Sequence, residues 1–178
     1  LKDNLEISDD TRIRLALPTI KFLLEKNCAI ILLTHLGRPG GKIDPKLSLK
    51  PCVNHLEKLL KKPVKLAPDC IGEQTKEIAM QLLPGEVLCL ENLRFYEAEK
   101  HPDKDPSFAK KIASYGNCFI NDAFATCHRK HSSITSLPSY FPKCSAMGFL
   151  LKQEINLLIS LMCNTYLPLF RVCLQTSH

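Results

Sequence analysis

Short apolar runs alternate with amphipathic segments along most of this chain, and this alternation restricts its possible folds more than any other sequence feature. Each run is brief and largely uninterrupted, which is typical of a strand buried on both faces of a parallel sheet. The predicted strands are "CAIILL", "VKLA", "EVLCLEN" and "NCFIND", within 28–33, 64–67, 86–92 and 117–122.

Helical patterns precede or separate these strands. In the first, Ile13, Leu17, Ile20 and Leu24 recur at helical spacing, and Pro18 either kinks the helix or marks its true start. Strands that alternate with helices indicate βαβ units. The sequence therefore predicts an α/β fold, an open and mostly parallel sheet with helices on both faces in a Rossmann-like three-layer arrangement. The predicted helices span 8–26, with Ser8, Asp9 and Asp10 as candidate caps, and 48–62, 72–83 and 105–116.

Basic residues follow three of the predicted strands at the point where each strand ends. In an open parallel sheet, ligands bind outside the carboxyl ends of the strands, so these loops should meet in space. Arginine presents a planar fork of donors that suits phosphate and carboxylate oxygens. The pattern therefore predicts a site for a small, multiply charged anion. Its residues would be His35, Arg38, Arg94, His128, Arg129 and His131, with Gly37, Gly40 and Gly41 allowing a close backbone approach and with Arg12 and Arg14 adding charge from the side.

Other interpretations of the same residues stay open or fail on spacing. Each arginine could be a solvated loop cation or could pair with a nearby acid, such as Glu91 or Asp122. The stretch "GRPGGKI" is not a P-loop, because its glycines are too close together and Ile43 follows the lysine. The stretch "CHRKH" lacks a second ligand cluster for zinc, and adjacent Cys127 and His128 do not suit nucleophilic catalysis. His55 has no expected catalytic role.

Charge and cysteine content narrow the class of protein. The net charge of +6 favours an anionic partner, but basic residues are dispersed and tryptophan is absent, which argues against nucleic acid. The nine cysteines form no Cys-x-x-Cys pair, so neither a disulfide framework nor a zinc ribbon is expected, and free thiols suit a reducing cytoplasm. The apolar run at 155–163 is too short to span a membrane and predicts a buried helix or strand.

In combination, these loops resemble the N-terminal domain of the phosphoglycerate kinase family. The resemblance covers about residues 1–155, and Ala125 and Cys127 stand where the family usually has glycine and alanine. The matching stretches are "DDTRIRLALPTI", "THLGRPGGK", "LSLKP", "KLAPDCIG", "LPGEVLCLENLRFYEAE", "DPSFAKKIAS", "NDAFATCHRKHSS" and "AMGFLLKQEI".

The resemblance implies reversible phosphoryl transfer between 1,3-bisphosphoglycerate and ADP, giving 3-phosphoglycerate and ATP, with Mg²⁺ accompanying the nucleotide. It implies that this domain binds the phosphoglycerate, while a separate C-terminal domain binds ADP or ATP. Arg12 would be catalytic, neutralising charge on the transferred phosphoryl group. The implied substrate-binding residues are Arg12, His35, Leu36, Gly37, Arg38, Arg94 and Arg129, with a weaker contribution from His128. This chain is expected to supply no cofactor or metal ligand.

Both ends depart from the family pattern. The family's first strand carries an Asp-Phe-Asn segment, and this chain starts after it, so residues 1–155 form a phosphoglycerate-binding domain without that strand. Residues 156–178 form a divergent tail, and the chain is expected to be truncated at both ends. A non-catalytic anion-binding fragment or an inactive remnant are the alternative functions. We expect a cytoplasmic monomer with no nucleic-acid or membrane partner.

Overall fold

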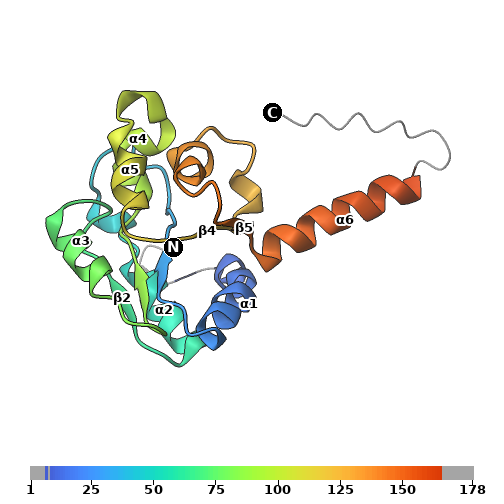
Figure 1. Ribbon diagram of the computed structural model, residues 1–178, viewed down its shortest axis with the longest axis horizontal. Helices are drawn as coiled ribbons and strands as arrows, with labels where there is room; N and C mark the ends of the chain where they lie inside the picture. Colours follow the sequence, from blue (N-terminus) through green and yellow to red (C-terminus); the bar gives the residue numbers. More distant parts are fainter. Residues whose placement is uncertain (1–6, 8, 166–178) are drawn as a thin grey trace.

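The computed structural model describes residues 7 and 9–165, and it shows the predicted α/β architecture with parallel, open sheets (Figure 1). The larger sheet contains β1 (Ile30–Leu32), β2 (Val64–Leu66) and β3 (Val87–Cys89) in the order β1-β3-β2. Both pairings are parallel, with Leu88 opposite Ile31 on one side and opposite Lys65 on the other. The carboxyl ends of all three strands therefore share one edge, as the βαβ pattern predicts.

Helices cover both faces of this sheet because alternate strand residues point to opposite sides. Val87 and Cys89 belong to a core cluster with residues of α1 (Thr11–Glu25) and α2 (Lys50–Leu60). Leu88 and Leu90 belong to a second cluster with residues of α3 (Glu73–Met80) and α5 (Ser107–Ala113). β3, buried on both faces, is the centre of a three-layer arrangement.

A second, two-stranded sheet lies beside the first. β4 (Phe119–Asn121) pairs in parallel with β5 (Ser145–Met147). α6 (Phe149–Thr165) follows β5 and packs on α1, with the rings of Phe149 and Phe22 5.2 Å apart. Short helical turns complete the described part of the chain: α4 (Glu97–Lys100), the 3-10 turns Pro45–Leu47, Leu93–Phe95, Pro102–Lys104, Phe124–Thr126 and Leu137–Tyr140, and the π turn Ser132–Ser136.

α1 continues through Pro18, so of the two alternatives for this proline the start of the helix is excluded. Of the three candidate caps, it is the Asp9 carboxylate that accepts a hydrogen bond from the Thr11 amide, at 2.9 Å. The prediction of a helix at 155–163 is confirmed, but the prediction of its burial is wrong for residues 156–161, whose side chains the structure describes as exposed. Leu157 and Ile159 are 56% and 54% exposed, because α6 extends away from the body of the molecule beyond its contact with α1 (Figure 1).

The expectation of free cysteines throughout is also wrong, because Cys118 and Cys144 form a disulfide. Each precedes one strand of the β4–β5 pair, and the Phe119 amide donates to the Cys144 carbonyl at 2.8 Å. Parallel pairing thus places side by side two cysteines 26 positions apart, a spacing that matches no short motif. Within the described residues, free thiols occur at Cys28, Cys52, Cys70, Cys89 and Cys127.

Reduction of this disulfide is expected to lower the free energy of unfolding by about 2–4 kcal/mol, because the cross-link restricts the unfolded chain. Urea denaturation with and without a dithiol reductant measures the difference. Cys118→Ala/Cys144→Ala should match the reduced wild type and should not respond to the reductant. A reductant effect of equal size in this variant would contradict the assignment.

No helix in the described ranges is long and apolar enough to cross a membrane.

Candidate anion-binding site

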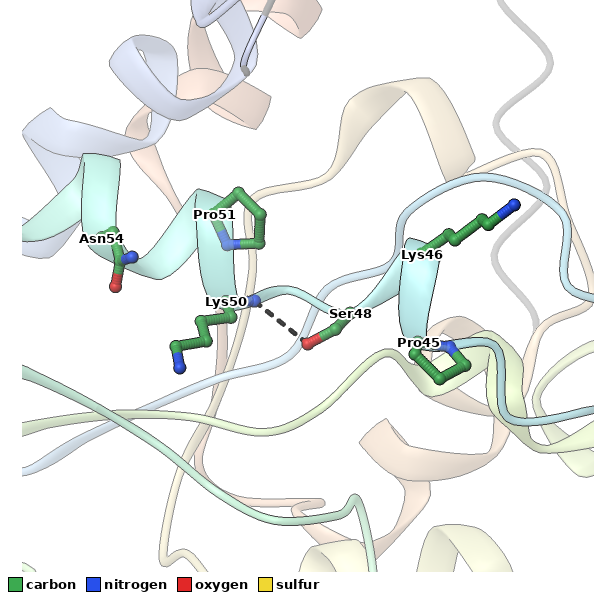
Figure 2. A pocket seen from close by; sticks show the side chains of 6 residues that line it. All are labelled: Pro45, Lys46, Ser48, Lys50, Pro51 and Asn54. Carbon is green, nitrogen blue, oxygen red and sulfur yellow. Dashed lines mark hydrogen bonds between the residues drawn. The ribbon is translucent and has the colours of Figure 1, made fainter. Parts of the chain in front are cut away.

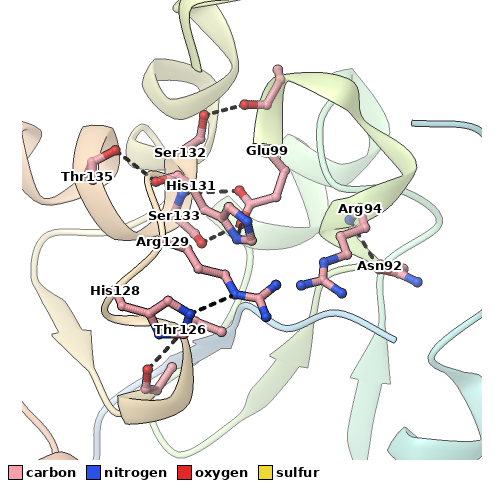
Figure 3. A network of polar contacts seen from close by, with 12 residues as sticks. Asn92, Arg94, Glu99, Thr126, His128, Arg129, His131, Ser132, Ser133 and Thr135 are labelled. Atoms are coloured by element: carbon pink, nitrogen blue, oxygen red, sulfur yellow. Dashed lines mark hydrogen bonds and ion pairs between the residues drawn. The ribbon is translucent and has the colours of Figure 1, made fainter. Parts of the chain in front are cut away.

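The loops that leave β1, β3 and β4 bring basic side chains near one another, although β4 belongs to the second sheet and not to the sheet of β1 and β3. Figure 3 shows the guanidinium groups of Arg94 and Arg129 directed toward each other. Burial lowers the pKa of His35 to about 4, and the charges of Arg94, His131, Arg12 and Arg129 act in the same direction. Residues from distant parts of the sequence therefore share one electrostatic environment, here called the cation cluster: Arg12, His35, Arg38, Arg94, His128, Arg129 and His131.

Arg94 is the buried centre of the cation cluster, with only 6% of its surface exposed. Its Nη1 donates to the Gly37 carbonyl at 2.7 Å, while its buried Nε finds no hydrogen-bond partner within the described residues. Burial lowers the pKa of Arg94, as do the charges of Arg129, Arg38 and Arg12. A buried cation with an unused donor, facing other cations, is suited to an anionic ligand.

The acids that could have neutralised the arginines have other partners. The Glu91 carboxylate accepts from Ser48 Oγ at 2.7 Å and from the Leu49 amide at 2.8 Å, so it holds the start of α2. Asp122 Oδ1 accepts from the Leu151 amide at 3.1 Å. None of Arg12, Arg38, Arg94 and Arg129 forms an ion pair in the part of the chain that the structure describes. The pairing of these arginines with Glu91 or Asp122 is therefore excluded.

Asn92 positions the loops on either side of Arg94, and the sequence analysis missed it. The side chain is fully buried and satisfies both of its polar ends. Its Oδ1 accepts from the Leu36 amide at 3.3 Å and from the Arg94 amide at 3.1 Å. Its Nδ2 donates to the carbonyls of Leu36 at 2.8 Å and Leu47 at 2.9 Å. The available signal was a strand-terminal asparagine followed by a tight turn, since Asn92 also caps the turn Leu93–Phe95.

Two glycines of the first loop, Gly37 and Gly41, pack closely against the protein, whereas a Cβ on Gly40 would meet nothing within 4 Å. Gly37, Gly40 and Gly41 have φ of 63°, 71° and 79°, a region that favours glycine. A Cβ on Gly41 would lie 3.2 Å from the backbone of Glu97, and the Gly41 amide donates to the Arg94 carbonyl at 3.3 Å. The loop thereby lies against the 94–97 segment.

Two of the remaining predicted cations join the cluster and one does not. The charge of Arg12, in the first turn of α1, lowers the pKa of both His35 and Arg94, although burial and the charges of other residues have larger effects. The exposed His128 ring accepts from Arg129 Nε at 3.4 Å. Arg14 instead pairs with Asp10 at 2.8 Å, and His55 contacts the same carboxylate oxygen at 2.8 Å. The suggestion that Arg14 adds charge to the site is therefore wrong, because its neighbour one helical turn back neutralises it.

A pocket of about 480 Å³ lies on another part of the surface, at the start of α2 (Figure 2). Its walls contain none of the predicted site residues. It is lined by Pro45, Lys46, Ser48, Lys50, Pro51 and Asn54.

The described residues contain no group of three or more His, Cys, Asp or Glu side chains that could hold a metal ion. The "CHRKH" stretch illustrates why. The Cys127 thiol is directed to the Ala123 carbonyl at 3.4 Å, whereas the His131 ring lies against Glu99 at 3.6 Å.

His35 should make stability depend on pH. Its folded-state pKa of about 4 lies below the ordinary 6.5, so the unfolded chain binds more protons between these values. The contribution of neutral His35 to the free energy of unfolding is complete above pH 6.5 and is lost as the pH falls toward 4. As the pH falls over this range, the free energy of unfolding of His35→Gln should decrease by about 1–2 kcal/mol less than that of the wild type. This value is reduced to allow for solvent screening.

Urea denaturation at pH 7 and pH 4.5 checks this expectation. Gln substitution of the exposed His101 provides the control and should follow the wild type. Identical pH dependence in the His35 and His101 variants would show that folding does not lower the pKa of His35.

Taken together, the fold and the cation cluster define an α/β domain with basic side chains gathered beyond the ends of its parallel strands. The phosphoglycerate kinase family profile matches residues 1–173. This chain belongs to the phosphoglycerate kinase family.

Individual relatives agree with this assignment. Over 159 residues the chain is 52% identical to phosphoglycerate kinase from Chlamydia caviae and 50% identical to that from Chlamydia trachomatis serovar L2, covering 89% of this chain and 39% of each relative. The structure of phosphoglycerate kinase from Coxiella burnetii is similar with a TM-score of 0.75 and 33% identity, over 89% of this chain and 39% of that one. For the enzyme from Pyrococcus horikoshii OT3 the TM-score is 0.81 at 31% identity, over 96% and 41%. The chain spans about two fifths of the relatives it matches.

Proposed function

We propose that this chain binds 3-phosphoglycerate and 1,3-bisphosphoglycerate in the cation cluster. The observation that carries the proposal is the buried guanidinium of Arg94, whose Nε has no partner within the described residues and which faces Arg129 rather than a carboxylate. A ligand with a phosphate at one end and a carboxylate or acyl phosphate at the other would neutralise several cations at once. His35, Arg38, Arg94 and Arg129 would bind it, with the peptide groups of Leu36 and Gly37 beside them and with His128 supporting Arg129.

The reaction we propose is phosphoryl transfer between 1,3-bisphosphoglycerate and ADP, in a protein that combines this chain with a nucleotide-binding half. Positioned cations contribute most to such a transfer, because phosphoryl transfer needs little covalent chemistry from the protein. No general base is needed, since the attacking group is already an anion. Arg12 is our candidate for the residue that neutralises the transferred group, since its charge reaches both His35 and Arg94. Mg²⁺ would arrive with ADP or ATP on the nucleotide-binding half.

Binding without turnover is the second candidate. An inactive remnant would fold without binding. We further propose a monomer that acts in the cytoplasm on small metabolites rather than on nucleic acid or membranes. The five free thiols among the described residues support a reducing compartment, in which the Cys118–Cys144 pair would be reduced.

Calorimetric titration of the purified chain with 3-phosphoglycerate tests the proposal, beside a circular dichroism spectrum that establishes folding. Saturable binding that Arg94→Met abolishes is expected, while Lys50→Ala, at the separate pocket, should bind normally. A folded chain without affinity would refute the proposed function. Addition of ADP, Mg²⁺ and 1,3-bisphosphoglycerate then separates turnover from binding alone.

A further inference from the structure

A buried carboxylate lies beside the cation cluster and does not belong to the binding set described above. Glu99, on α4, is 1% exposed. Its two oxygens accept from the Ser133 amide at 3.1 Å and from Ser133 Oγ at 2.6 Å. The Nδ1 atom of His131 lies 3.6 Å from Oε1 (Figure 3). One acid therefore contacts two residues of the turn that follows Arg129.

The same turn is attached to α4 a second time. Ser132 Oγ donates to the Ala98 carbonyl at 2.6 Å, next to Glu99 in the chain. Ser132 is itself 2% exposed, so these contacts are shielded from water. The turn 131–133 begins two residues after Arg129, and α4 begins three residues after Arg94. The junction between α4 and this turn thus connects the segments that carry the two facing arginines.

The charges around the junction are mostly positive. Burial raises the pKa of Glu99, whereas the Ser133 hydrogen bonds and the Arg94 charge lower it. Burial lowers the pKa of His131, and Arg94, Arg129, Lys100 and His128 lower it further. The Glu99 charge raises the pKa of Arg94, whereas the charges of Arg129, Arg38 and Arg12 lower it. The Glu99 carboxylate therefore offsets part of the repulsion between the cations when no ligand is bound.

We propose that Glu99 is a positioning residue for the anion site: its carboxylate fixes the turn 131–133 against α4 and so sets how the Arg129 guanidinium faces that of Arg94. The inference rests on the proposed function, since positioning matters only if both arginines bind one ligand. Glu99 itself is not expected to touch that ligand, because its side chain is 1% exposed and its carboxylate would repel an anion.

The test separates charge from shape. Glu99→Gln keeps the size of the side chain and an oxygen for Ser133 but removes the charge, while Ser133→Ala removes one hydrogen bond and keeps the charge. We expect Glu99→Gln to weaken 3-phosphoglycerate binding about tenfold, at the lower end of the effect that outer partners have on bound groups. Glu99→Asp should restore part of the affinity. Glu97→Gln, on the exposed side of the same helix, is the matched control and should bind as the wild type does.

Two further measurements would distinguish positioning from a purely structural role. Wild-type affinity should fall at acidic pH as Glu99 becomes protonated, whereas Glu99→Gln should lack that component. NMR titration of the His131 ring should show a further decrease of its pKa in Glu99→Gln, because the acid 3.6 Å from its Nδ1 atom has lost its charge. This second readout needs no ligand.

The outcomes are separable. Failure of the folded wild type to bind 3-phosphoglycerate would refute the proposed function, and the positioning role would fall with it. A wild type that binds, together with Glu99→Gln and Ser133→Ala variants of unchanged affinity and an unshifted His131 titration, would overturn the role of Glu99 alone. If Glu99→Gln does not fold, a loss of affinity in folded Ser133→Ala supports the proposal and its absence contradicts it.

Discussion

Replacement of Asn92 with alanine is expected to lower the free energy of unfolding by about 3–5 kcal/mol, since each buried polar group left unpaired costs about 1–3 kcal/mol. Four backbone groups would lose their partner: the amides of Leu36 and Arg94 and the carbonyls of Leu36 and Leu47. Some of them can gain water, so the cost is smaller than the full sum. The loop that carries His35 and Arg38 would also lose its attachment to the segment of Arg94.

Urea denaturation measures the change, and titration with 3-phosphoglycerate tests whether the site is lost with it. Asn54→Ala is the control, because Asn54 is an exposed asparagine on α2. Its effect on stability should be small. Asn92→Asp should be nearly as damaging as Asn92→Ala, because a carboxylate cannot donate to the two carbonyls. A stability loss below about 1 kcal/mol in Asn92→Ala would contradict the proposed role of this side chain.

Removal of the guanidinium from Arg38 or Arg129 is expected to weaken 3-phosphoglycerate binding by about 1.5–3 kcal/mol in each case, the usual range for hydrogen bonds to charged groups. This corresponds to roughly a 10-fold to 150-fold increase in Kd. Both side chains are exposed and form no ion pair within the described residues, so alanine should leave folding intact. The double variant should lose more affinity than either single variant, with an interaction term if both arginines bind the same anionic group.

Calorimetry of the four proteins gives the complete cycle. Arg14→Ala is a matched control, because Arg14 is paired with Asp10 and lies outside the cation cluster. It should bind with wild-type affinity. Unchanged affinity in both Arg38→Ala and Arg129→Ala would place the ligand elsewhere and refute the site.

The sequence predicted some features of this protein because they depend on local patterns. Four continuous apolar runs indicated the strands, and the βαβ order required parallel pairing, which β1, β2 and β3 show. Parallel pairing in turn required His35 and Arg94 to leave β1 and β3 at one edge, whereas Arg129 follows β4 of the second sheet. The charge of the site and its approximate composition therefore followed from residue types and their order along the chain.

Other features depended on contacts between distant segments, which no local pattern contains. Cys118 and Cys144 became neighbours through the pairing of β4 with β5, and Arg14 was separated from the site by its contact with Asp10. The apolar residues of α6 predicted burial, but whether a helix is buried depends on the elements packed against it. Asn92 and Glu99 likewise look like ordinary polar residues in the sequence. Only the fold surrounds them with backbone groups, hydroxyls and cations, and their burial makes those hydrogen bonds and charges strong enough to position the site.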